Sequence, residues 1–182
     1  MSSEDATAGQ AFQDSVRKES RVADHSGTID EQQMLVSTFF LGDAAFGIDT
    51  EQVQEVVRVG DITSVHHAPQ YVLGVMNLRG RIATVIDLGI KLDLARTEIG
   101  PDSRIFIVEW EGEQIGLLVD RVADAIAIDR TDLKPPPENV RSLQGHQFKG
   151  VCSVEGRLVA LLDMAAVLDV EGGTESGTAR SE

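Results

Sequence analysis

Short runs of apolar residues alternate with polar ones through the middle of this chain, which is the periodicity of β-strands rather than of helices. Two pairs of such runs are each separated by a short turn: residues 34–41 with 45–48, and residues 104–110 with 113–119. Gly42-Asp43 and Glu111-Gly112 occupy these two turns. Glycine-containing turns of this length between apolar runs predict β-hairpins.

Helices are expected to be short and to lie at the joints between strands. Asp87 and Asp163 can each cap a helix that follows a strand. Asp49 begins a pattern like a capping box, which predicts a helical turn extending through Val56. Glu55 would then lie on this turn of helix.

Two stretches of 14 residues in the chain are similar in sequence. Residues 74–87 read GVMNLRGRIATVID, and residues 150–163 read GVCSVEGRLVALLD, 76 positions later. A shorter repeat precedes each copy, in which Gly47, Val53 and Glu55 recur with the same spacing as Gly116, Val122 and Asp124. Such internal similarity indicates that one structural unit has been built twice. The copies differ at the turn, where Arg79 of the first corresponds to Glu155 of the second.

Many short strands separated by turn signals predict a mostly β fold of small barrels with short helices at the joints, rather than a layered α/β sheet. The folded domain is expected over residues 34–170, with repeat units at about 34–95 and 104–168. Residues 1–33, which are rich in acidic side chains, and residues 171–182 are too polar to offset the entropy of ordering. They are expected to be disordered tails. The repeat leaves open which strands complete which barrel.

The composition of the chain disfavours several classes of function. The net charge of −14 disfavours binding to nucleic acids and to anionic membranes, because both depend on Lys and Arg. The single cysteine, Cys152, excludes an internal disulfide and suits a reducing cytosol. No apolar run approaches the roughly 20 residues that span a bilayer. A cytoplasmic protein without direct membrane insertion is therefore expected.

Candidate catalytic and metal-binding residues are few. His66-His67 is an adjacent pair whose side chains point to opposite sides of an extended chain, so the two rings cannot easily share a metal. Cys152 has no histidine placed beside it as a base. Asp43 and Asp49 are explained by turn and capping roles. The sequence therefore predicts no catalytic residue, no cofactor and no metal site.

Arg79 is the residue that needs a further explanation. An arginine at a hairpin turn is often merely solvated, but its counterpart in the second copy is Glu155, while the surrounding glycines match. Variation at one position of a repeated scaffold is what a contact site would produce. Glu55 is a candidate ion-pair partner that would orient the guanidinium for the acceptors of a binding partner.

The chain resembles the CheW family of chemotaxis adaptors in a series of short motifs. They are Phe46-Gly47-Ile48-Asp49, Val53-Gln54-Glu55-Val56, Gly74-Val75, Asn77-Leu78-Arg79-Gly80-Arg81, Val85-Ile86-Asp87-Leu88, Gly116-Leu117-Leu118-Val119-Asp120 with Val122, and Gly150-Val151 through Leu162-Asp163. The resemblance covers about residues 34–168. It implies two five-stranded β-barrel subdomains related to SH3 barrels, which agrees with the duplicated hairpins.

The resemblance also implies a function. Family members are not enzymes but couple the cytoplasmic tip of a methyl-accepting chemoreceptor to the regulatory domain of the histidine kinase CheA, at membrane-associated receptor arrays in the cytoplasm. Receptor control of kinase autophosphorylation depends on this coupling. Association with other CheW-like domains in array rings is left open.

Site residues follow from the matched motifs. The resemblance implies receptor binding by Arg79 and Glu55, together with Val53, Asn77, Leu78, Gly80 and Val122. Kinase binding is expected at Leu73 and Ile82, which flank the same hairpin.

Two alternatives remain beside this hypothesis. The chain could be a CheW-like adaptor of a non-flagellar pathway that controls surface motility, development or a second messenger. It could also be a small β-barrel enzyme that uses Asp43, Asp49 or His146, which would require a pocket with convergent, pKa-perturbed groups.

Overall fold

The computed structural model describes residues 31–136 and 145–169. The predicted tails are residues 1–33 and 171–182. They lie outside the described residues, except for residues 31–33. Gln33, at the end of that predicted tail, is already the first residue of a strand.

The described residues form ten strands with short helical turns between some of them. In chain order the elements are β1 (Gln33–Leu41), β2 (Ala44–Asp49), η1 (Thr50–Gln52), β3 (Val53–Arg58), β4 (Val72–Leu78), β5 (Arg81–Asp87), α2 (Leu88–Lys91), β6 (Arg104–Trp110), β7 (Glu113–Val119), β8 (Arg121–Asp129), η2 (Arg130–Asp132), η3 (Gly145–Gln147), β9 (Phe148–Val154), β10 (Arg157–Leu162) and α4 (Met164–Leu168). The predicted mostly β fold with short helices at the joints is confirmed.

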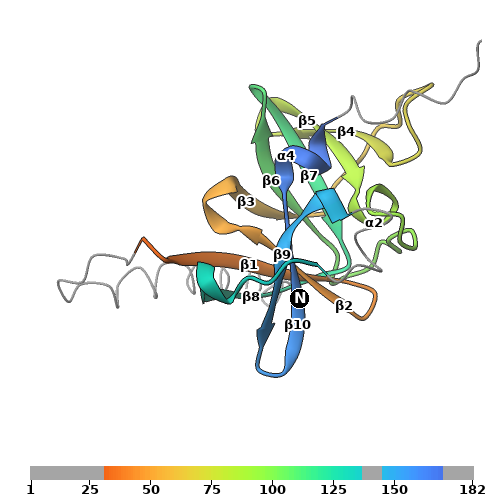
Figure 1. Cartoon of the computed structure of the whole chain (residues 1–182). Coiled ribbons are helices and arrows are strands. Elements are labelled where there is room, and N and C mark those ends of the chain that lie inside the picture. The colour runs from red at the N-terminus through yellow and green to blue at the C-terminus, as the bar shows by residue number, and fades with distance from the viewer. Residues whose placement is uncertain (1–30, 137–144, 170–182) are drawn as a thin grey trace, which may run out of the picture.

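The strands make two five-stranded sheets (Figure 1). Sheet A has the order β8-β1-β2-β10-β9, and sheet B has the order β3-β6-β7-β5-β4. The two orders are equivalent. When the two repeat units are aligned in sequence, each strand of sheet A corresponds to the strand at the same position in sheet B. In both sheets the pairing at the centre is parallel, between β2 and β10 in sheet A and between β7 and β5 in sheet B.

Each sheet combines strands from both repeat units. The β1–β2 hairpin of the first unit pairs with β8 and β10 of the second, and the β6–β7 hairpin of the second unit pairs with β3 and β5 of the first. The repeat units have thus exchanged their first hairpins. This exchange answers the question that the sequence left open.

In each sheet an isolated bridge connects the segment that follows one outer strand to the other outer strand. Thr63, beyond β3, bridges Val75 of β4, and Lys134, beyond β8, bridges Val151 of β9. Glycine precedes the bridged residue in both copies of the repeat. A Cβ at Gly74 would collide with the carbonyl oxygen of Thr63, and one at Gly150 would lie 2.8 Å from that of Lys134. The matched glycines therefore permit the close approach of these backbones.

Three hydrophobic clusters hold the sheets together. One lies within sheet A around Val36 and Phe40, and another lies within sheet B around Ile105 and Ile107. The third, here called the central cluster, includes Phe39 and Phe106, whose ring centroids are 5.3 Å apart, and takes residues from both sheets and from α2 and α4. Because side chains alternate along a strand, β1 and β6 are buried on both faces.

The two repeated hairpins have the same turn. Arg79 and Gly80 have φ values of 51° and 85°, and Glu155 and Gly156 have values of 50° and 79°. Positive φ at both central residues of a two-residue loop defines the type I′ turn that suits β-hairpins. Asn77 supports the first turn, because its Oδ1 accepts a hydrogen bond of 2.8 Å from the Gly80 amide.

The predicted caps are confirmed, but one helix is shorter than expected. The side chains of Asp87 and Asp163 accept hydrogen bonds from the amides of Ile90 and Ala166 at the starts of α2 and α4. Asp49 also caps, but η1 ends at Gln52. The predicted helical turn through Val56 is therefore wrong, because this segment pairs with β6 as strand β3. Glu55 lies on that strand.

We expect Gly80→Val to lower the free energy of unfolding by about 1–3 kcal/mol, because a β-branched residue is strained in the left-handed region. Gly100→Val is the matched control, since a Cβ at either glycine would meet nothing within 4 Å but only Gly80 of the two has a positive φ in that region. Urea denaturation measures both. An unchanged transition for Gly80→Val would contradict the need for glycine at this turn.

Candidate functional site

The structure brings Glu55 and Arg79 into a direct ion pair. Nη2 of Arg79 donates to Oε2 of Glu55 at 2.8 Å, and Nη1 lies 3.5 Å from Oε1. Glu55 comes from β3 and Arg79 from the β4–β5 turn, which belong to the two outer strands of sheet B. The ion pair therefore connects the two edges of sheet B.

The two partners differ in exposure. The side chain of Arg79 is 78% exposed, whereas that of Glu55 is 19% exposed. A pair with one exposed member contributes about 0–1 kcal/mol to stability. Its more important effect is geometric, because the carboxylate holds the guanidinium in place while other N–H donors of this group stay open to solvent.

The corresponding position in sheet A has no such pair. Asp124 and Glu155, the counterparts of Glu55 and Arg79, are both acidic and line a cavity of about 310 Å³. Two arginines occupy the same cavity wall, and the guanidinium carbons of Arg121 and Arg157 lie 3.8 and 5.1 Å from the ring centroid of Phe40. Among the described residues, the oriented arginine at a hairpin tip is thus a property of one repeat unit and not of both.

The other residues expected to bind a receptor are divided between two places. Asn77, Leu78 and Gly80 lie with Arg79 at the tip of the β4–β5 hairpin. Val53 begins the strand that carries Glu55, and Val122 lies in β8 of sheet A. Both valines are partly buried against the central cluster.

The two residues expected to bind a kinase have different environments. Leu73 is partly buried against the cluster within sheet B, whereas Ile82 on β5 is 61% exposed. Leu158, the counterpart of Ile82 on β10, is 65% exposed. Sequence reasoning did not single out Leu158, although its offset of 76 residues from Ile82 was a signal that could have found it.

The candidate catalytic residues lie in three different elements. Asp43 is in the β1–β2 turn, Asp49 caps η1, and His146 lies in η3. Among residues 31–136 and 145–169, no group of three or more His, Cys, Asp or Glu side chains could hold a metal ion. No helix in the same ranges is long and apolar enough to cross a membrane.

Cys152 is a packing residue of sheet A. It is 3% exposed, and its thiol donates a weak hydrogen bond to the carbonyl oxygen of Val159 at 3.8 Å. Burial raises the pKa of this thiol, and the negative charge of Asp132 adds to the increase. The interpretation of Cys152 as a buried thiol is confirmed.

Comparison with known proteins decides the family. The model of the CheW-like domain matches residues 35–172. The chain belongs to the CheW family. This finding confirms the resemblance that the motifs indicated.

Two similar proteins each align with more than two thirds of this chain. The chemotaxis protein CheW of Rhizobium meliloti (strain 1021) is 31% identical over 133 residues, which are 73% of this chain and 86% of the relative. Protein FrzA of Myxococcus xanthus is 33% identical over 123 residues, which are 68% of this chain and 76% of the relative.

A solved member of the CheW family has the same fold. The scaffolding protein TtCheW from Thermoanaerobacter tengcongensis is 30% identical, with a TM-score of 0.72 over 81% of this chain and 96% of that protein. As a member of this family of scaffolding proteins, the chain is not an enzyme, as the sequence predicted.

We expect iodoacetamide to label Cys152 at least about tenfold more slowly in the folded chain than in urea near pH 8.5, because the thiolate is the reactive form and its pKa is raised in the folded state. A raised pKa stabilises the fold below the unfolded pKa, and this contribution is lost as pH rises through the folded value. Mass spectrometry follows the label, which reports one site because the chain has one cysteine. Equal labelling rates would contradict the burial of the thiol.

Proposed function

We propose that this protein is a chemotaxis adaptor that couples methyl-accepting chemoreceptors to the histidine kinase CheA. Family membership supports the general role, and the ion pair between Arg79 and Glu55 is the observation that carries the receptor contact. An arginine that is held by a carboxylate and is still 78% exposed is prepared to bind acceptors on a partner without first losing much side-chain freedom.

The receptor tip binds at the end of sheet B that carries this pair. Arg79 supplies charge, Asn77 and Gly80 shape the turn, and Leu78 supplies apolar surface at the tip. Val53 and Val122, which pack against the central cluster, extend this apolar contact toward sheet A. The difference between the two repeat units favours this assignment, because Glu155 at the corresponding tip has the opposite charge. A receptor surface that accepts hydrogen bonds from Arg79 would be repelled by the tip of sheet A.

The kinase binds at the β4–β5 hairpin of the same sheet. Ile82 is the side chain best placed for this contact, since it is 61% exposed on β5. Leu73, which is partly buried, supports the strand on the inner side. With receptor and kinase on one sheet, a change in the receptor biases CheA autophosphorylation through differential contacts with the adaptor.

The adaptor works in the cytoplasm at membrane-associated receptor arrays. Its acidic character is consistent with binding to proteins rather than to lipid headgroups, because polybasic segments are what anionic membranes attract. Exposed Leu158 on sheet A offers a second apolar contact for a further CheW-like domain in an array.

A second candidate is an adaptor role in a pathway with an output other than flagellar swimming. The similarity to protein FrzA favours it, because this relative is as similar in sequence as the chemotaxis proteins but does not carry their name. A swimming defect after deletion of the gene would favour the first candidate, and normal swimming with altered surface motility would favour the second.

Kinase autophosphorylation in receptor-containing membranes from the same organism tests the coupling role. Wild-type protein is expected to activate CheA strongly, and Arg79→Glu is expected to weaken receptor binding by about tenfold or more and to remove this activation. The variant should fold, because Glu155 already occupies the same backbone conformation. Its free energy of unfolding should change by no more than about 1 kcal/mol.

Arg96→Glu provides the matched control, since Arg96 is exposed in the loop after α2 and undergoes the same charge reversal. Activation that survives in Arg79→Glu, or that is lost equally in Arg96→Glu, would argue against a specific receptor contact at Arg79. A folded wild-type protein without any effect on the kinase would contradict the coupling role itself.

A further inference from the structure

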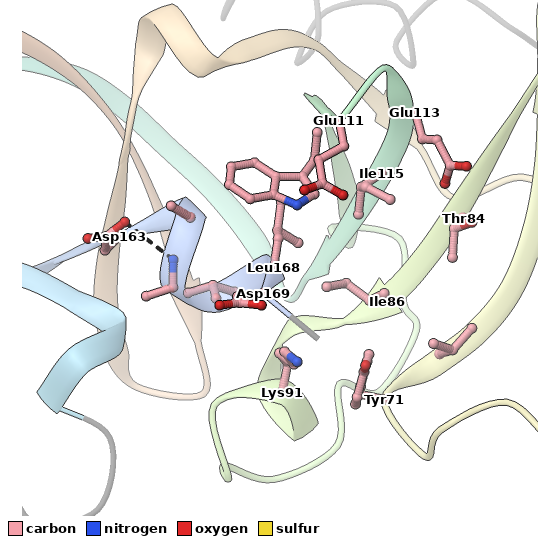
Figure 2. A pocket seen from close by; sticks show the side chains of 15 residues that line it. Tyr71, Thr84, Ile86, Lys91, Glu111, Glu113, Ile115, Asp163, Leu168 and Asp169 are labelled. Carbon is pink, nitrogen blue, oxygen red and sulfur yellow. Dashed lines mark hydrogen bonds between the residues drawn. The ribbon is translucent and has the colours of Figure 1, made fainter. Parts of the chain in front are cut away.

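A groove of about 960 Å³ lies between sheet B and α4 (Figure 2). Strands β5 and β7 and the β6–β7 turn form one wall, and α4, which follows β10 of sheet A, forms the other. None of the residues assigned to receptor or kinase binding lines this groove. Its occupant therefore does not follow from the function proposed above.

Aromatic and aliphatic side chains form an apolar part of the groove. Trp110, Tyr71 and Ile115 are each partly buried, and buried Leu168 from α4 lies opposite them. Tryptophan and tyrosine in such positions are typical anchors of protein interfaces, because they offer a large apolar area at a low cost in side-chain entropy. This surface suits apolar side chains of a partner.

Acidic side chains dominate the charge around this apolar part. Four carboxylates line the groove: Glu111, Glu113, Asp163 and Asp169. Glu111 and Glu113 are exposed and lie at the top of the view in Figure 2, with Lys91 and Tyr71 at the bottom. Among the described residues of the lining Lys91 is the one cation, and its Nζ lies 4.1 Å from the ring centroid of Tyr71. An occupant with positive charge is therefore favoured.

We propose that this groove binds a segment of a partner protein in which apolar side chains are flanked by Lys or Arg. The apolar side chains lie against Trp110 and Ile115, and the cations lie near Glu111 and Glu113 and over the aromatic faces. A second copy of this chain fits poorly as the occupant, because its net charge of −14 would bring like charges together.

Trp110 provides a direct measurement, because it is the only tryptophan of the chain. The full-length protein is titrated with a synthetic amphipathic helical peptide of leucine and lysine, while the tryptophan emission is recorded. We expect a saturable change in the emission of Trp110. The same peptide with glutamate in place of lysine is expected to give no change.

Glu111→Lys is expected to weaken binding of the leucine–lysine peptide by about fivefold, because an attraction becomes a repulsion. Glu155→Lys is the matched control, since Glu155 occupies a turn with nearly the same φ values as Glu111 and the net charge changes equally. Glu155→Lys should bind as the parent does. Glu113→Lys repeats the test at a second position should Glu111→Lys fail to fold.

Equal weakening by Glu111→Lys and Glu155→Lys would show attraction to the whole acidic chain and would overturn the proposal. No change in Trp110 emission on addition of the leucine–lysine peptide would overturn it as well. Without any peptide, the wavelength of the Trp110 emission maximum could instead shift as protein concentration rises. If Glu111→Lys alters this shift, the groove is assigned to a second copy of the chain.

Discussion

Burial of β1 and β6 on both faces is the constraint on which the rest of the structure depends. Each of these strands directs one set of side chains into the hydrophobic cluster of its own sheet and the other set into the central cluster. Phe39 and Phe106 meet there, and truncation of such a ring in a core typically costs about 3–5 kcal/mol. Neither sheet could separate from the other without exposing one apolar face of each hairpin.

The exchange of hairpins between the repeat units makes this packing possible. The β1–β2 hairpin pairs with strands of the second unit, so that the connection from β2 to β3 crosses from sheet A to sheet B through the three residues of η1, 50–52. Glu55 is the third residue of β3, the strand that follows this crossing. Its position opposite the β4–β5 turn is therefore fixed by the same chain path that joins the two sheets, which gives the pair with Arg79 a rigid support.

The hairpins and their turns could be predicted from the sequence, whereas the pairing of the sheets could not. A two-residue turn with glycine joins strands that are neighbours in the chain, so local residues determine the result. The choice of β8 rather than β3 as the partner of β1 depends on packing between distant segments, and a strand that is apolar on both faces does not reveal which face belongs to which core. The position of Glu55 was mispredicted for a related reason, because a capping pattern at Asp49 is satisfied by a single turn of helix and pairing with β6 then takes over.

The candidate site was predictable where it depended on the repeat and not where it depended on surface shape. The difference between Arg79 and Glu155 identified one hairpin tip, and the structure confirms Glu55 as the ion-pair partner that the sequence suggested. The groove beside α4 had no comparable signal, because Trp110 and Leu168 are far apart in the sequence and meet only after the two sheets have packed.

Three turns of the same type show how one backbone device can serve different surfaces. Arg79, Glu111 and Glu155 each precede a glycine and each have a φ between 50° and 52°. The glycine and the positive φ satisfy the hairpin, and the charged side chain is not required for the turn. What distinguishes the three tips is the neighbour that each one meets: a carboxylate for Arg79, the groove of Trp110 for Glu111, and the cavity beside Phe40 for Glu155. Because the turn tolerates either charge, each tip can be matched to a different partner without a change in the fold.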